Sequence, residues 1–122
     1  MNKDVKKILV VDDEYFFCKI LDKYLSRLGY AVIISMNGEQ ALEMIALEKP
    51  DLVTLDIRMP GVNGYDILEK LRLHQSPVKI VVISAIDTPE MEAQMKAAGA
   101  SAVFLKPVEL EEIGRVVKEL IG

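Results

Sequence analysis

Residues 51–64 read Asp-Leu-Val-Thr-Leu-Asp-Ile-Arg-Met-Pro-Gly-Val-Asn-Gly, and this stretch decides the fold. Its segment Leu52–Leu55 is apolar except at Thr54, a continuous pattern typical of a strand that is buried on both faces. Asp56 follows at once, and Met59-Pro60-Gly61 then signals a turn. The stretch therefore predicts a strand of a parallel sheet that ends in a carboxylate.

The same kind of segment recurs along the chain. Four further short, β-branched runs are predicted strands: Ile8–Val11, Ala31–Ile34, Ile80–Ile83 and Ala102–Leu105. The segments after the strands have helical periodicity or helix start and stop signals: Glu14–Leu28, Gly38–Leu47, Gly64–Leu73, a helix that Thr88-Pro89-Glu90 opens and Gly99 ends, and Glu109–Leu120. Five β-α units joined by right-handed crossovers predict a doubly wound α/β sheet. Because the sequence contains no linker-like segment, residues 1–122 are expected to form one domain.

For two of the helices, the sequence also predicts which side chains are buried. In the first, six apolar residues are expected on one buried face: Phe17, Ile20, Leu21, Tyr24, Leu25 and Leu28. In the last, five are expected to point inward: Ile113, Val116, Val117, Leu120 and Ile121. Gly114 interrupts this last helix at a cost of about 1 kcal/mol against Ala, and the sequence offers no reason for it.

Composition and charge exclude several classes of protein. The chain has 122 residues, is 51% hydrophobic and has a formal net charge of −4, so it lacks the basic surface expected for direct nucleic-acid binding. Its apolar runs are far below the roughly 20 residues that span a bilayer. Met1–Lys7 is polar and charged, unlike a signal peptide. From these features we expect no membrane insertion. Because Cys18 is the one cysteine, we also expect no internal disulfide and a cytoplasmic location.

Polar residues follow four of the five predicted strands. They are Asp12 and Asp13, Asp56, Ser84 and Lys106. In a doubly wound sheet these carboxyl ends meet at one edge, where ligands bind. Three carboxylates brought together there would repel one another strongly, so a bound cation is expected. Hard oxygen ligands favour Mg²⁺ or Mn²⁺.

A carboxylate, a hydroxyl, an ammonium and a metal ion around one point suit phosphoryl transfer. Asp56 is then the nucleophile, while Ser84 and Lys106 contact phosphoryl oxygens. Taken singly, each residue also has a simpler interpretation. Asp12 and Asp13 could cap the first helix, Asp56 could belong to a turn, and Lys106 could be a solvated surface cation. Ser84 at a strand end could be structural or incidental. Their joint placement at strand ends favours the site.

Four segments resemble the motifs of a known family: Ile8-Leu9-Val10-Val11-Asp12-Asp13-Glu14, Asp51–Gly64, Val82-Ile83-Ser84-Ala85 and Phe104-Leu105-Lys106-Pro107. Over essentially its whole length the chain resembles the response-regulator receiver domains of bacterial two-component signalling, the CheY-like family. The resemblance implies a flavodoxin-like fold with a five-stranded parallel sheet in the order 2-1-3-4-5.

The resemblance also implies roles for individual residues. Asp56 is the phosphoacceptor, Asp13, Asp56 and the backbone carbonyl of Arg58 bind Mg²⁺, and Asp12 acts on the metal through water. Lys106–Pro107 is a cis peptide that aims the lysine at the phosphoryl group. Ser84 and Phe104 form the conformational switch. Arg58 and Ile86 are expected to tune dephosphorylation.

The function that the resemblance implies is a signalling switch and not an enzyme, with intrinsic autophosphorylation and slow autodephosphorylation. The donor is a histidine kinase or a histidine phosphotransfer protein. The output is a downstream effector protein or an output domain outside these residues. A stand-alone regulator or phosphorelay intermediate is the preferred interpretation. His74 is expected at the surface and not as a phosphohistidine.

Other classes of protein fit less well. A metal-dependent aspartyl phosphatase of the haloacid-dehalogenase type has Asp-x-Asp after its first strand, whereas Asp12 and Asp13 are contiguous here. A flavin-binding module of similar topology needs a phosphate-binding loop after that strand, which is absent. A degenerate receiver that only binds partners remains an alternative, although all five site residues argue against it.

Overall fold

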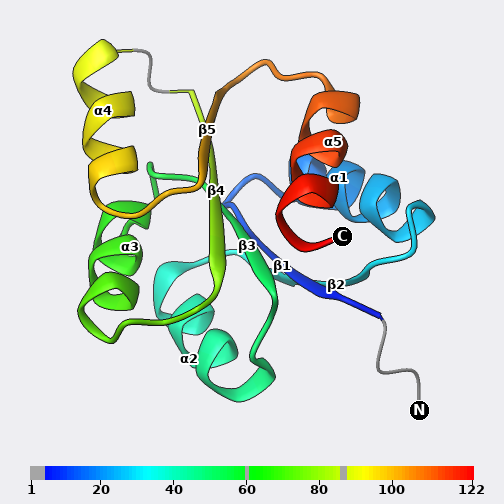
Figure 1. The fold of residues 1–122 in the computed structure, drawn as a ribbon, viewed down its shortest axis with the longest axis horizontal. Coiled ribbons are helices and arrows are strands. Elements are labelled where there is room, and N and C mark those ends of the chain that lie inside the picture. Colours follow the sequence, from blue (N-terminus) through cyan, green and yellow to red (C-terminus); the bar gives the residue numbers. More distant parts are fainter. Residues whose placement is uncertain (1–4, 60, 86–87) are drawn as a thin grey trace.

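The computed structural model describes residues 5–59, 61–85 and 88–122. Its strands are β1 (Lys7–Val11), β2 (Ala31–Ser35), β3 (Leu52–Leu55), β4 (Lys79–Ser84) and β5 (Ala102–Leu105). Its helices are α1 (Tyr15–Arg27), α2 (Gly38–Glu48), α3 (Gly64–Leu73), α4 (Pro89–Ala97) and α5 (Leu110–Ile121). All strand pairs are parallel, in the order β2-β1-β3-β4-β5, so the predicted doubly wound sheet is confirmed (Figure 1).

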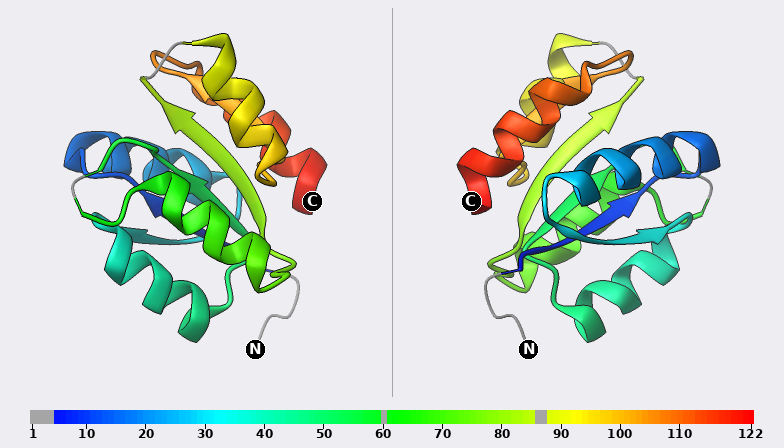
Figure 2. Two further views of the ribbon diagram at one scale, coloured as in Figure 1. Left: turned by 90° about the vertical axis from the view of Figure 1, so that its left-hand side faces the viewer. Right: turned by 90° about the vertical axis from the view of Figure 1, so that its right-hand side faces the viewer.

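Two layers of helices cover the sheet. Alternate strand residues point to opposite faces, so Ile8 and Val10 pack with α1 and α5, whereas Leu9 and Val11 pack with α2, α3 and α4. The helices stand on either side of the strands in both side views (Figure 2). Each face has its own apolar core, which is the reason why the strands read as continuous apolar runs.

Burial on both faces was expected of all five strands, and it holds only for the three central ones. β1, β3 and β4 are almost fully buried, whereas most residues of β2 and β5 are half-buried and Leu105 is exposed. β2 and β5 are the edge strands, so each has a neighbour on one side only. The apolar pattern alone does not distinguish an edge strand from a central one.

The predicted buried face of α1 was partly wrong. Leu21 and Leu25 are fully buried together with Cys18, but Ile20 and Leu28 are 54% and 50% exposed. Ile20 lies far around the helix from the buried stripe, and Leu28 lies beyond its last turn as the C-cap. The inward residues of α5 were predicted correctly, because Ile113 and Val117 are buried and the others pack against them.

Two further helix signals are confirmed. The Thr88 hydroxyl accepts a hydrogen bond from the Met91 N–H at 3.1 Å, with Pro89 in the first helical position of α4. His74 is the exposed C-cap of α3.

Ile86 and most of Met1–Lys7 lie outside the described residues. Within the described ranges, no helix has the length and apolarity needed to cross a membrane.

Candidate functional site

Backbone hydrogen bonds continue the sheet by one residue past three strand ends. The Asp12 N–H donates to the Ser35 carbonyl at 3.2 Å, and the Asp56 N–H donates to the Val11 carbonyl at 3.0 Å. On the other side of the sheet, the Lys106 N–H donates to the Ser84 carbonyl at 2.8 Å. These bonds anchor the backbone from which the Asp12, Asp56 and Lys106 side chains project.

Three carboxylates lie together at this edge. One oxygen from each of Asp12, Asp13 and Asp56 lies within 4.8 Å of the others, with Asp12 and Asp56 buried and Asp13 exposed. All of these donors are hard oxygens, and one side of the cluster opens to solvent through Asp13, which suits Mg²⁺ with its retained water ligands. The residues present therefore fit the metal ion that the sequence predicts.

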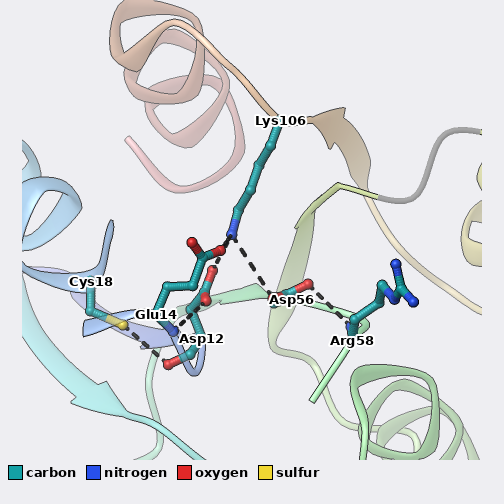
Figure 3. Close-up of polar contacts among 6 residues, drawn as sticks. All are labelled: Asp12, Glu14, Cys18, Asp56, Arg58 and Lys106. Atoms are coloured by element: carbon teal, nitrogen blue, oxygen red, sulfur yellow. Dashed lines mark hydrogen bonds and ion pairs between the residues drawn. The ribbon is translucent and has the colours of Figure 1, made fainter. Parts of the chain in front are cut away.

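One oxygen of each buried carboxylate is held by a nearby N–H. Asp12 Oδ1 accepts a hydrogen bond from the Glu14 N–H at 2.9 Å, and Asp56 Oδ1 accepts one from the Arg58 N–H at 3.1 Å (Figure 3). The capping alternative for the acidic pair is not observed, because the N-cap of α1 is Glu14 and makes no side-chain capping bond. Burial raises the pKa of Asp12, and the neighbouring Asp56 charge adds to this, although bonds from Lys106 and Glu14 oppose it.

Lys106 closes the site from the end of β5. Its Nζ lies 2.8 Å from Asp12 Oδ2, 2.7 Å from Glu14 Oε1 and 3.9 Å from Asp56 Oδ2 (Figure 3). The ammonium also lies 4.4 Å from the centre of the Phe17 ring. The peptide bond from Lys106 to Pro107 is cis. Burial alone would lower the pKa of this lysine, but its carboxylate partners raise it above the ordinary value.

Three members of this site were not anticipated from the sequence. Glu14 and Phe17 contact the Lys106 ammonium, and the buried Cys18 donates its thiol proton to the Asp12 carbonyl at 3.3 Å. Glu14 directly follows the acidic pair, which was the available signal. Its partner is 92 residues away in the chain, so local patterns could not reveal the contact.

The remaining predicted residues occupy neighbouring positions. Ser84 is buried at the end of β4, and Phe104 is half-buried against the core that α1 and α5 share. The start of α3 approaches the acceptor closely, because a Cβ on Gly64 would overlap the Asp56 carbonyl. Asn63 begins this helix with a capping box completed by Asp66.

Comparison with known protein families shows the family to which the chain belongs. The model of the response regulator receiver domain matches residues 8–118. The chain belongs to the response regulator receiver family. Receiver domains are signalling switches of two-component systems, they bind Mg²⁺ at an acidic pocket, and they interact with histidine kinases and output effectors. In this receiver, the cluster of Asp12, Asp13 and Asp56 could hold such a metal ion.

Two relatives differ in how much of their own length the chain covers. Sporulation initiation phosphotransferase F of Bacillus subtilis is 34% identical over 116 residues, which cover 95% of this chain and 94% of the relative. The alkaline phosphatase synthesis transcriptional regulatory protein PhoP of the same organism is 35% identical over 116 residues, covering 95% of this receiver but 48% of the relative. The receiver thus spans nearly all of one relative and about half of the other.

Solved receiver structures share the fold. The BeF3-activated N-terminal receiver domain of Klebsiella pneumoniae RstA is 30% identical, with a TM-score of 0.89 and coverage of 95% of this chain and 98% of that one. The signal receiver domain of the response regulator NarL from Mycobacterium tuberculosis is 31% identical, with a TM-score of 0.86 and coverage of 94% of both chains.

Proposed function

We propose that this receiver accepts a phosphoryl group on Asp56 from a phosphohistidine donor, in a Mg²⁺-dependent reaction that changes which partner it binds. One observation carries the proposal: the buried Asp56 carboxylate lies beside two further carboxylates and 3.9 Å from the Lys106 ammonium. This combination offers a nucleophile, a cation site and a fixed positive charge within one small volume.

The proposed chemistry assigns one task to each group. Asp56 attacks phosphorus through Oδ2, since Oδ1 is held by the Arg58 N–H, and the P–N bond of the donor breaks with its electron pair returning to the imidazole. Asp13, Asp56 and the Arg58 carbonyl would hold Mg²⁺, with Asp12 acting through water. When bound, the metal supplies positive charge opposite the phosphoryl oxygens. The Ser84 hydroxyl and the Lys106 ammonium would bind the other oxygens.

The surface around the site supports a donor-docking role for the start of α1. Phe16 is 80% exposed although it is apolar, and it lies close in sequence to Asp13. An exposed aromatic ring beside an acidic pocket suits a protein surface that presents a phosphohistidine. On the output side, Ser84 would move toward the phosphoryl group and Phe104 would change rotamer in step.

One relative suggests a place for this receiver in a phosphorelay. This receiver aligns with nearly the whole of a Bacillus subtilis sporulation phosphotransferase, which makes a phosphorelay intermediate or stand-alone regulator in the cytoplasm our preferred proposal. Residues 1–122 would then act as a single domain that signals through a separate effector protein. Matches to longer transcriptional regulators keep a receiver with an attached output region as the alternative outcome.

Intact-mass measurement tests the central proposal. The native receiver and Asp56→Asn are incubated with acetyl phosphate, with and without Mg²⁺, and with Mn²⁺ as a substitute. We expect a labile phosphoryl adduct on the native chain only, and only when the metal is present. No adduct from acetyl phosphate or from a cognate kinase would indicate a receiver that only binds partners. Continuous release of phosphate from a free phosphoester would indicate a phosphatase instead.

A further inference from the structure

The Lys106 ammonium is held on the α1 side of the site and not on the acceptor. It donates to Asp12 at 2.8 Å and to Glu14 at 2.7 Å, whereas its 3.9 Å separation from Asp56 Oδ2 is too long for a hydrogen bond. The Phe17 ring of α1 also lies near the ammonium, which is 4.4 Å from the ring centre. The ammonium is therefore held more closely by Asp12 and Glu14 than by Asp56 (Figure 3).

We propose that Glu14 is a positioning residue that competes with the phosphorylated Asp56 for Lys106 and thereby slows phosphorylation. The inference rests on the proposed function, because the competing ligand is a phosphoryl oxygen bound to Asp56. Among the described residues, the Glu14 carboxylate contacts Lys106 and none of the expected metal ligands, so Glu14 acts through the lysine.

The balance of contacts gives the direction of the effect. An ammonium has three N–H donors, and Asp12 and Glu14 occupy two of them. Glu14 and Asp56 are separate partners of the ammonium, at 2.7 Å and 3.9 Å, so a shift of Nζ toward a phosphoryl oxygen on Asp56 would lengthen the Glu14 contact (Figure 3). The Lys106–Glu14 pair thus stabilises the unphosphorylated receiver more than the phosphorylated one, so removing it favours phosphorylation.

The exposure of Glu14 limits the size of the effect. Its side chain is 64% exposed, against 14% for Lys106, so water screens much of the attraction. An exposed ion pair of this kind corresponds to about a two- to fivefold change in rate. Asp12 would remain bound to Lys106 in any variant of Glu14, so the lysine keeps a partner.

Two substitutions separate the contact from the charge. Glu14→Gln removes the negative charge, whereas Glu14→Asp keeps the charge but shortens the side chain by one methylene, which takes its carboxylate out of reach of Lys106. We expect both variants to form the acetyl phosphate adduct about two to five times faster than the native receiver at saturating Mg²⁺. Intact mass against time gives the rates.

A second readout follows Lys106 directly. In NMR spectra of the lysine NH3⁺ groups, both variants should shift the Lys106 signal of the free protein. In the complex with Mg²⁺ and beryllofluoride, Glu14→Asp and the native receiver should give the same Lys106 signal, because the lysine has then left residue 14. A merely structural role of Glu14 would not produce this state-dependent difference.

The outcomes separate this inference from the proposed function. Native rates in Glu14→Asp, or a Lys106 signal that still depends on residue 14 in the beryllofluoride complex, would overturn the competition while leaving Asp56 as the acceptor. Faster reaction in Glu14→Gln alone would also overturn it, since charge and not contact would then be responsible. No adduct on the native receiver would overturn the proposed function, and this inference with it.

Discussion

Gly114 of α5 lies directly against Tyr24 of α1: a Cβ built on Gly114 would come within 2.9 Å of the Tyr24 ring carbon Cε2. The same atom would be 3.1 Å from both the Tyr24 hydroxyl and Leu28 Cδ1. The two helices on this face of the sheet therefore approach each other closely at a residue that has no side chain. This contact explains a glycine that the helix propensity of α5 makes costly.

Gly114→Ala should destabilise the receiver, although Ala gains about 1 kcal/mol of helix propensity. We expect the free energy of unfolding to fall by about 1–3 kcal/mol, as in other overpacked cores. Urea denaturation followed by circular dichroism measures this change. In a Tyr24→Ala background the penalty should shrink, because the clashing ring is gone. A more stable Gly114→Ala single variant would show that the helices separate freely.

Mg²⁺ should stabilise the folded receiver, and Asp13 should be required for it. At a hundredfold excess over Kd, a metal that binds only the folded state adds about 2.7 kcal/mol to the free energy of unfolding. Asp13→Asn should lose most of this gain, yet be more stable than the native chain without metal, because one of three close carboxylates is neutralised. Thermal unfolding with and without Mg²⁺ tests both effects. Glu43→Gln, an exposed acid of α2, is the control that should keep the full metal response.

Cys18 should resist modification in the folded receiver. Burial raises the pKa of its thiol from 9.0 to about 11, and the Asp12 charge adds to this. Between these two values the unfolded chain loses the thiol proton while the folded chain retains it, so the stability contributed by this residue falls as the pH rises from 9.0 toward 11. Iodoacetamide at pH 8 should react slowly with the native protein and quickly in urea. A Cys18→Ala chain should lose less stability than the native chain over that pH range, and equal losses would contradict the burial of the thiolate.

Phe16→Ala should impair transfer from a protein donor but not from a small one. Phe16 and Leu47 are both 80% exposed, but Leu47 lies on α2 and makes a matched control. We expect transfer from a phosphohistidine protein to slow by about fivefold or more in Phe16→Ala, as for an interface residue worth over 1 kcal/mol. The rate with acetyl phosphate should stay at the native value. Slower transfer in Leu47→Ala as well would place the docking surface elsewhere.

The sequence predicted the five β-α units and their order along the chain, because hydrophobic periodicity is a local property. Several element ends differ from the prediction by one residue, as at β1 and α5. The depth of burial was less predictable. Ile20 has the same apolar character as Leu21, yet it is exposed, because the direction in which a helix faces the sheet is set by packing along its whole length.

The candidate site was likewise predicted only in part from the sequence. Asp12, Asp13 and Asp56 were found from their places after strands, since parallel strands bring their carboxyl ends to one edge whatever the details of packing. The Lys106–Glu14 pair was not found, because neither residue type nor spacing specifies which carboxylate a long, flexible side chain reaches.

Local residue patterns thus specify the doubly wound sheet, the sheet edge where the candidate site lies and the acidic cluster placed there. Tertiary packing specifies that Lys106 contacts Glu14 and Phe17, that Gly114 makes room for Tyr24, and that the Cys18 thiol donates to the Asp12 carbonyl. The physical reason is that periodicity and strand ends are encoded in neighbouring residues. Contacts between elements depend instead on how far apart and at what angle helices pack on the sheet, which the whole core sets at once.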